Sequence, residues 1–463
     1  MQKASESGAC AGSEKLLWRN ELPVREDVDI FVAGGGPAGI AAAVMAARQG
    51  ASVYLAEGSG ALGGMGTTGL VPAFMQFTDG VNFLAGGFGR ELYDKFWQVG
   101  GAGPDDNPDS SRKDCCIHAE TLKRVYDEMA LAAGFKFSFF TQLIGVQRQD
   151  GGGAGGAVTH AICSAKSGVF AIRAKFFIDA TGDGDLAVMA GADFEKGDAD
   201  GGMMPGTLCS LWANIDWPIA RASKLWAQAM VPEGLKRGVL KINDPHLPGI
   251  WRVGRSIGGG NVGHTFGVDS TDERSLTNAM IEGRRMLGPY HEFYKTVMKG
   301  YEHMELVGTA PLLGIRESRR IVGDYQMTAD DFNARAVFPD EIGRYAYPAD
   351  MHASKPGAAH FDAFWKNFEA MRYKDGESYG IPYRALTPRK LDNVFVTGRC
   401  VSCDRTMLSS LRVMPGCFIT GQAAGVAAAM AVSGNISTTR AVNIAELQKR
   451  LKYLGAYLPN FKG

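Results

Sequence analysis

The chain has 463 residues, of which 45% are hydrophobic and 61 are glycine, so it can bury a large core and turn tightly at many points. This composition excludes a small module, a disordered chain and a collagen. Basic and acidic residues are equal at 49 each, which leaves no net positive field to attract nucleic acid or anionic lipid. We therefore expect a small, locally recognised ligand and no nucleic-acid partner.

The sequence also predicts where the protein resides. Its longest uncharged apolar run, residues 423–432, is about half of the ~20 residues that cross a bilayer, so we expect no membrane span. The start of the chain, residues 1–28, is polar and lacks the apolar core of a secretory signal. Eight cysteines spread over the chain are typical of reduced thiols, and we expect a cytoplasmic protein.

The first predicted elements form a strand, turn, helix and strand. An apolar strand over residues 28–33 ends at the turn 34–39, which reads G-G-G-P-A-G and fits G-x-G-x-x-G. An alanine-rich helix over 40–49 and a second strand over 52–56 follow, with Glu57 at the end of the second strand. This order predicts a dinucleotide-binding βαβ unit.

Each glycine of the turn has a physical role in such a unit. Gly34 allows the sharp turn, Gly36 lets the backbone approach a pyrophosphate, and Gly39 lets the helix pack on the strand. Glu57 is placed to accept hydrogen bonds from ribose hydroxyls. A second glycine-rich loop, residues 62–68, follows that acid and suits a cofactor longer than NAD, which favours FAD.

The middle of the chain predicts a meander and then a change of domain. Strands are expected over 140–146, 157–163 and 169–178, and the composition shifts near residue 192. In the second part, the best helix is expected to begin at Ser270 with a capping box to Glu273. A strand over 393–397 and an alanine-rich helix over 416–431 then return to the first pattern.

These elements predict an α/β fold of two domains. A Rossmann-like nucleotide-binding domain with a parallel sheet and a β-meander would comprise residues 26–200 and 381–463. An α+β substrate or cap domain, residues 201–380, would be inserted between the two parts.

Several motifs together carry a resemblance to a known family. They are GGGPAGIAAA at 34–43, LGGMGTTG at 62–69, DATGDGD at 179–185, GIRESRR at 314–320, IPYR at 381–384, GRCVS at 398–402 and RVMPGCFITGQAAG at 412–425. In this order they resemble FAD-dependent oxidoreductases of the glutathione-reductase-like superfamily, distantly similar to fumarate reductase and succinate dehydrogenase flavoproteins. Residues 61–68 contain no histidine for covalent flavin attachment, so the resemblance implies noncovalent FAD.

The resemblance also implies which residues contact FAD. They are Gly34, Gly36, Pro37, Ala38, Gly39, Glu57, Gly63, Gly64, Met65, Leu143, Ala180, Thr181, Gly182, Gly398, Arg399, Gly421, Gln422 and Ala423. The flavin would lie at the amino end of the 416–431 helix, whose partial positive charge stabilises reduced flavin. The implied reaction is hydride transfer between FAD and a small polar substrate, bearing a carboxylate or a hydroxyl, at the domain interface.

Three residues are candidates for the catalytic side of that interface. Arg384 lies where the chain re-enters the nucleotide-binding domain, and domain junctions form clefts. Arg316 lies in a charged segment and could hold a substrate oxygen, unless Glu317 simply pairs with a neighbouring arginine. His264 follows the glycine-rich stretch 258–263, which we interpret as a mobile loop, and could transfer a proton.

Other readings of the sequence stay open. Cys400 and Cys403 have C-x-x-C spacing and could form a dithiol that exchanges electrons with flavin, although two packed side chains in a turn explain them as well. The FAD could also serve only to stabilise a regulatory or structural protein. No metal site is expected, and the substrate, the electron acceptor or donor and the oligomeric state are left undefined.

Overall fold

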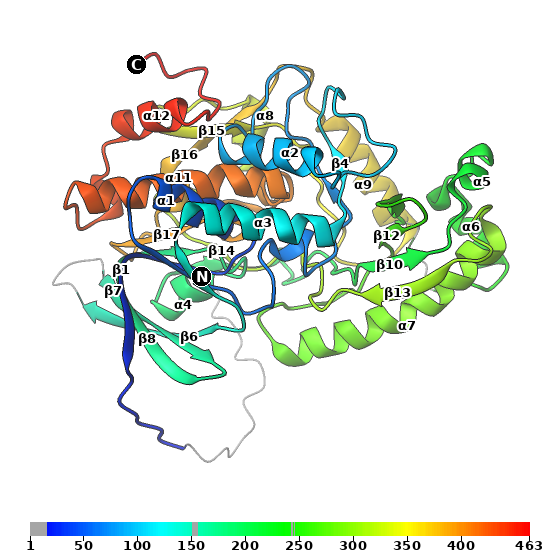
Figure 1. Cartoon of the computed structure of the whole chain (residues 1–463). Helices are drawn as coiled ribbons and strands as arrows, with labels where there is room; N and C mark the ends of the chain where they lie inside the picture. Colours follow the sequence, from blue (N-terminus) through cyan, green and yellow to red (C-terminus); the bar gives the residue numbers. More distant parts are fainter. Residues whose placement is uncertain (1–15, 151–155, 242–243, 245) are drawn as a thin grey trace.

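The computed structural model describes residues 16–150, 156–241, 244 and 246–463. Its central feature is a seven-stranded sheet of order β5-β2-β1-β8-β7-β6, with β17 also paired to β8 (Figure 1). The strands are β1 (Val24–Ala33), β2 (Val53–Ala56), β5 (Lys136–Ser138), β6 (Gln142–Asp150), β7 (Gly156–Ala165), β8 (Gly168–Asp179) and β17 (Val394–Val396). β1, β2, β5, β8 and β17 run parallel, whereas β6, β7 and β8 form an antiparallel meander. The predicted α/β class with a parallel sheet is confirmed.

Alternating side chains of β1 belong to two different hydrophobic cores. Ile30 and Val32 belong to the cluster that contains the long helices, while Phe31 and Ala33 belong to the cluster beneath the meander. Side chains alternate between the two faces of a strand, so a fully apolar strand is buried on both sides. This explains why residues 28–33 read as a continuous apolar run.

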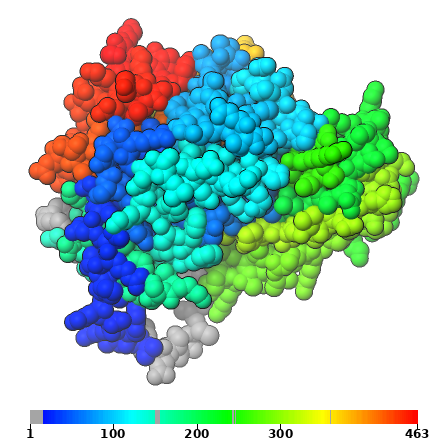
Figure 2. Space-filling model, viewed as in Figure 1, coloured from blue at the N-terminus to red at the C-terminus, as the bar shows by residue number. Residues whose placement is uncertain are grey.

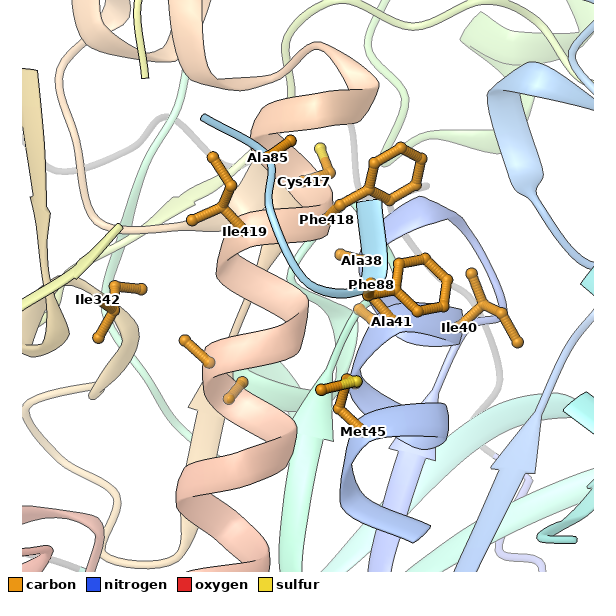
Figure 3. Packing of buried hydrophobic residues seen from close by; sticks show 14 of the residues in the cluster. Ala38, Ile40, Ala41, Met45, Ala85, Phe88, Ile342, Cys417, Phe418 and Ile419 are labelled. Atoms are coloured by element: carbon orange, nitrogen blue, oxygen red, sulfur yellow. The ribbon is translucent and has the colours of Figure 1, made fainter. Parts of the chain in front are cut away.

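Two helices pack closely on the first of these cores. α1 (Pro37–Arg48) lies beside α11 (Met414–Ser433), as Figure 3 shows. A Cβ added to Gly421 would lie 2.1 Å from the carbonyl oxygen of Ala38, and one added to Gly425 would lie 2.2 Å from that of Ala42. The two helix backbones can therefore approach this closely only because both positions are glycine.

α11 contains no charged residue. It is the one helix of the described residues that is long and apolar enough to cross a membrane. Within the protein, however, 83% of its most apolar 18-residue stretch is buried. Its apolar character is accounted for by its place between α1 and the rest of the core.

A second sheet lies to one side of the first. It has the order β11-β12-β10-β13, with β10 (Ser210–Ala213), β11 (Gly249–Arg252), β12 (Gly258–Asn261) and β13 (Glu305–Thr309). α7 (Glu273–Val297), α5 (Trp217–Ala222) and α6 (Val231–Lys236) surround it. In Figure 2 these green and yellow segments project from the body of the molecule.

Two local predictions in this region were wrong. The stretch 258–263 is not a mobile loop, because Gly258–Asn261 forms the inner strand β12, where the absence of side chains lets Trp212 and Pro72 pack close. The long helix does not begin at Ser270 but at Glu273, because Asp272 accepts a hydrogen bond from the Ser275 amide and caps it.

The remaining elements connect the two sheets and cover them. They are β3 (Ala73–Phe74), α2 (Phe88–Gln98), β4 (Cys115–Cys116), α3 (Ala119–Ala133), α4 (Asp185–Met189), β9 (Phe194–Glu195), β14 (Arg320–Ile321), α8 (Ala329–Ala334), β15 (Glu341–Tyr345), α9 (Ala358–Ala370), β16 (Tyr379–Pro382), α10 (Arg405–Leu411) and α12 (Ile444–Tyr453). Ile342 and Tyr345 of β15 share the core cluster of α1 and α11. Part of the segment predicted as the inserted domain thus packs in the core of the nucleotide-binding domain.

Candidate functional site

The glycine-rich turn between β1 and α1 forms the first wall of the site. Gly34 has φ +90°, and a Cβ there would lie 2.7 Å from the carbonyl oxygen of Ala180. A Cβ on Gly39 would lie 1.8 Å from the carbonyl oxygen of Gly34, so this position in the first turn of α1 must be glycine for the helix to pack on the turn. Gly36 differs, because a Cβ there would meet no atom within 4 Å. Gly36 and Pro37 therefore present open backbone at the amino end of α1, where an anionic group is favoured.

Glu57 ties this turn to the next loop. One carboxylate oxygen accepts a 2.7 Å hydrogen bond from the Gly35 amide, and the other accepts one of 2.7 Å from the Ser59 amide. The second loop lies against the first, since the Gly63 amide donates to the Gly35 carbonyl at 2.8 Å. Gly64 follows it, and a Cβ on Gly64 would lie 3.0 Å from the Cα of Gly36. The two glycine-rich loops form one continuous backbone surface.

The ends of β8 and β17 complete this surface. The Ala180 amide donates to the carbonyl of Ala33, which places the A-T-G-D turn beside the first glycine turn. The carboxylate of Asp179 accepts hydrogen bonds from the amide and the hydroxyl of Thr181, while Gly182 leaves room for the guanidinium of Arg399. Arg399 follows Gly398 after β17 and pairs with Asp183 at 3.0 Å. These residues come together because the carboxyl ends of parallel strands share one edge of the sheet.

Leu143 lies at the beginning of the meander. It pairs with Cys163 between β6 and β7 and packs on the core beneath the meander. The side-chain oxygen of Gln142 lies 2.7 Å from the position that a Cβ on Gly58 would take. This part of β6 is therefore next to the loop that follows Glu57.

Three residues predicted to contact FAD have other partners. Gly421 packs on the backbone of α1, and Ala423 is fully buried in the same core. The side chain of Gln422 accepts a hydrogen bond from the Phe88 amide at 2.8 Å and donates to the Gly86 carbonyl. We therefore revise the prediction for these three, because the close contact of α1 and α11 occupies them.

The described residues fit FAD at both of its ends. The open backbone at Gly36 and the carboxylate of Glu57 suit the pyrophosphate and the ribose. At the other end, no side chain caps the amino end of α11 beside Val413, so its amides and positive dipole are available to a flavin. The two ends are joined by the second loop, whose Met65 lies beside the same cavity as Met414.

That cavity has a volume of about 350 Å³, within the range typical of small-molecule sites. Met65, Arg399 and Met414 line it from the side of the nucleotide-binding domain. An aromatic wall of the cavity consists of Trp226, Trp251, Tyr347, Phe364, Trp365 and Phe368. Aromatic rings of this kind can pack against the face of another ring.

One end of the cavity is polar and strongly charged. Arg316 is buried and donates to the Pro205 carbonyl at 2.8 Å and to Thr207 Oγ1 at 2.9 Å. Burial, and then the neighbouring Arg412, lower the pKa of Arg316 to about 10, so the guanidinium still carries its charge at pH 7. Arg412 in turn donates to Asp350 at 2.9 Å.

Asp350 is the anionic partner of this end. Burial by itself would raise the pKa of Asp350, but the interaction with His352 and the charges of Arg412 and Arg316 hold it well below its ordinary value. His352 Nε2 lies 3.2 Å from an oxygen of Asp350. Burial and the nearby Arg316 lower the pKa of His352, so the imidazole is neutral and donates Nε2–H to the carboxylate.

Two further histidines stand beside His352. His246 lines the cavity, and burial followed by the proximity of His264 lowers its pKa to about 3. His264 lies behind His246 and His352 and does not line the main cavity. Its Nδ1 is 2.8 Å from Asp244, and burial lowers its pKa despite that partner. Of the three predicted catalytic residues, Arg316 thus lines the cavity and His264 lies directly behind its wall.

Arg384 lies elsewhere, and the expectation that it holds substrate must be corrected. It is outside the cavity, with 46% of its side chain exposed, and it pairs with Asp340 at 2.9 Å. Its guanidinium also covers the ring of Tyr325. These two neighbours hold Arg384 at the outer surface of the protein.

The charged segment around Arg316 and the C-x-x-C pair are explained by packing. Glu317 forms ion pairs with Arg320 and Arg405, both at 2.8 Å. Cys400 and Cys403 are fully buried, and their thiols approach backbone carbonyls. Burial raises the pKa of both thiols, which disfavours the thiolate that disulfide exchange requires. The geometry therefore favours packed side chains over a redox dithiol.

Sequence reasoning missed most of the polar end. His246, His352, Asp350 and Arg412 were not singled out, although two signals were present. Asp-x-His occurs twice, at 244–246 and 350–352. Arg412 opens the motif that carries α11, directly before the amino end of that helix.

Comparison with known proteins identifies the family. The family model described as FAD dependent oxidoreductase matches residues 29–451. A geranylgeranyl bacteriochlorophyll reductase-like protein from Thermoplasma acidophilum is 11% identical, with a TM-score of 0.45, over 93% of this chain and 84% of that one. The p-nitrophenol 4-monooxygenase of Pseudomonas putida is 11% identical, with a TM-score of 0.44, over 92% and 84%. No curated protein sequence matches the chain.

Proposed function

We propose that this chain, which belongs to the FAD dependent oxidoreductase family, transfers a hydride between noncovalent FAD and a small substrate that bears a carboxylate or a hydroxyl. Family membership confirms the predicted cofactor and the oxidoreductase class. The narrower likeness to fumarate reductase and succinate dehydrogenase flavoproteins stays a prediction. When bound, FAD supplies the two-electron chemistry, and the protein supplies binding, orientation and proton transfer.

One observation carries the proposal. Residues beside the predicted flavin position, Met65 and Met414, share a single cavity with Arg316, Arg412 and His352. A compound held at the polar end would therefore face the flavin without crossing a wall. Because the flavin ring would occupy part of this volume of about 350 Å³, the space that remains favours a small compound.

Each polar group has a distinct role in this proposal. Arg316 and Arg412 offer planar donors that suit a carboxylate or paired hydroxyls. The aromatic wall excludes water and orients the carbon skeleton. The imidazoles of His246 and His352 form a histidine wall at the same end, where the oxygen that gains or loses a proton during hydride transfer would lie.

The reaction is tested by anaerobic reduction of the bound flavin. The FAD-loaded protein is mixed with a panel of hydroxy acids, cyclic polyols and sugar acids, together with matched compounds in which the hydroxyl is methylated. Bleaching of the flavin absorption band by one hydroxyl compound, and not by its methyl ether, supports the proposal. Failure of the whole panel to reduce the flavin, with photoreduced flavin also inert towards unsaturated and keto acids, contradicts it.

We also propose a cytoplasmic location for the protein. All seven cysteines in the described part of the chain are free thiols. Free thiols on this scale suit a reducing compartment. Fractionation of cells that express the full-length chain tests this location.

A further inference from the structure

The histidine cluster, His246, His264 and His352, has a geometry that the proposed reaction alone does not require. One potential ligand atom from each residue lies within 4.8 Å of the other two. The ring of His264 is nearly perpendicular to those of His246 and His352, with centroids 5.0 and 5.2 Å away, whereas His246 and His352 are stacked in parallel with centroids 4.5 Å apart. Three imidazoles that bind one ion through nitrogens at about 2.0–2.1 Å have their ring centres about 5 Å apart. The spacing of the rings matches that of a three-histidine metal site, and His246, the ring that no carboxylate of the described residues holds, must rotate out of its stack on His352 for all three to bind one ion in their ring planes.

Carboxylates hold two of these rings from the outside. His264 Nδ1 lies 2.8 Å from Asp244, and His352 Nε2 lies 3.2 Å from Asp350. At these distances the carboxylates favour a proton on the facing nitrogen, which leaves a lone pair on the opposite nitrogen of each ring. A carboxylate behind the imidazole is the usual partner of a metal-binding histidine.

The opposite nitrogens have no partner. His264 Nε2 and His352 Nδ1 are buried and accept no hydrogen bond, in residues that are 4% and 5% exposed. A buried acceptor without a partner destabilises the folded protein. Two such acceptors side by side need a shared cation or a shared donor between them.

We propose that the histidine cluster binds one divalent transition-metal ion, with Zn²⁺ as the expected ion. Three imidazoles suit zinc and its neighbours, whereas magnesium and calcium prefer oxygen ligands. Asp244 and Asp350 lie behind the ligands and offset the charge of the ion. Three protein ligands leave one tetrahedral position free, as in catalytic zinc sites.

The free coordination position would allow the ion to bind the substrate. His246 and His352 line the cavity, so an ion between the histidines would be accessible from it. There it would bind an oxygen of the substrate and ease the loss of its proton. This role rests on the proposed function, but binding of the ion itself can be measured without any substrate.

The experiment measures zinc bound to FAD-loaded protein. The protein is stripped with a chelator and dialysed against Zn²⁺, and the metal is counted by mass spectrometry. We expect about one zinc per chain, and a loss of affinity on the order of a hundredfold or more in His246→Ala and His352→Ala. Asp244→Asn should weaken binding about 10- to 100-fold, because it removes the carboxylate that orients His264. His303→Ala, at an exposed histidine outside the cluster, is the matched control and should bind zinc as the wild type does.

Flavin content and melting temperature are recorded for every variant, so that a variant that fails to fold is recognised. If a histidine variant does not fold, the zinc affinity of Asp244→Asn, the mildest change, tests the proposal instead. Equal zinc binding by the wild type and by folded variants of the cluster overturns the proposal. So does a wild type that binds no zinc, in which case a water or a substrate hydroxyl is the donor that the two nitrogens share. Zinc binding without flavin reduction would refute the proposed reaction and keep the metal site; flavin reduction without zinc binding would do the reverse.

Discussion

Replacement of Arg316 by methionine tests whether substrate binds in the cavity or at the surface around Arg384. Its guanidinium is buried, and two of its donors are engaged by the Pro205 carbonyl and Thr207. Loss of a charged contact to a substrate oxygen costs about 2–4 kcal/mol, or about 30- to 1,000-fold in kcat/KM. The two protein acceptors lose a donor as well, so the melting temperature should also fall.

Arg384→Met is the matched control for this change. Arg384 pairs with Asp340 at a half-exposed position, and such a pair contributes at most about 1 kcal/mol to stability. We expect its rate of flavin reduction, per bound FAD, to equal that of the wild type. The assay is stopped-flow reduction of the flavin by the compound that the panel identifies. If Arg316→Met reduces flavin at the wild-type rate, or if Arg384→Met is slowed as much, the cavity is not the substrate site.

Three other predictions follow from buried groups. Cys400→Ser and Cys403→Ser should leave flavin reoxidation by disulfide acceptors unchanged, because the thiols are buried; a selective loss of this reaction would revive the dithiol. Burial raises the pKa of Asp179 to about 6, so the folded state binds more protons than the unfolded chain between about pH 6 and pH 4. The wild type should therefore gain up to about 3 kcal/mol in free energy of unfolding, relative to Asp179→Asn, as the pH falls through this window. A difference between the two proteins that does not change with pH would contradict this assignment. Gly421→Ala should force α1 and α11 apart and lower the free energy of unfolding by about 1–3 kcal/mol. Both the melting temperature and the FAD content should therefore fall. Gly288→Ala, where a Cβ meets no atom within 4 Å, should not lower either quantity.

The half of the site that binds the nucleotide could be predicted because its signals are local. Gly34, Gly36 and Gly39 are specified by contacts within one turn, and Glu57 ends the next strand. Turn, helix and acid follow one another in the sequence at fixed spacing, so the order alone indicates their geometry. The same locality explains the error at Gly421, since G-Q-A-A-G reads as a binding motif when the neighbouring helix is not visible.

The substrate half could not be predicted in this way, because its residues meet only in the folded chain. His246, Arg316, His352 and Arg412 come from four separate segments, and each one alone has an ordinary explanation. What distinguishes them is that Asp350 pairs with both His352 and Arg412, and that two imidazole nitrogens are left without partners. Such a set of buried charges and acceptors is costly for the fold to maintain. Arg384 has a partner that satisfies it at the surface, whereas the polar end of the cavity holds two buried imidazole nitrogens without a partner among the described residues. That difference, rather than proximity to a domain junction, is the reason to propose the chemistry at the polar end of the cavity.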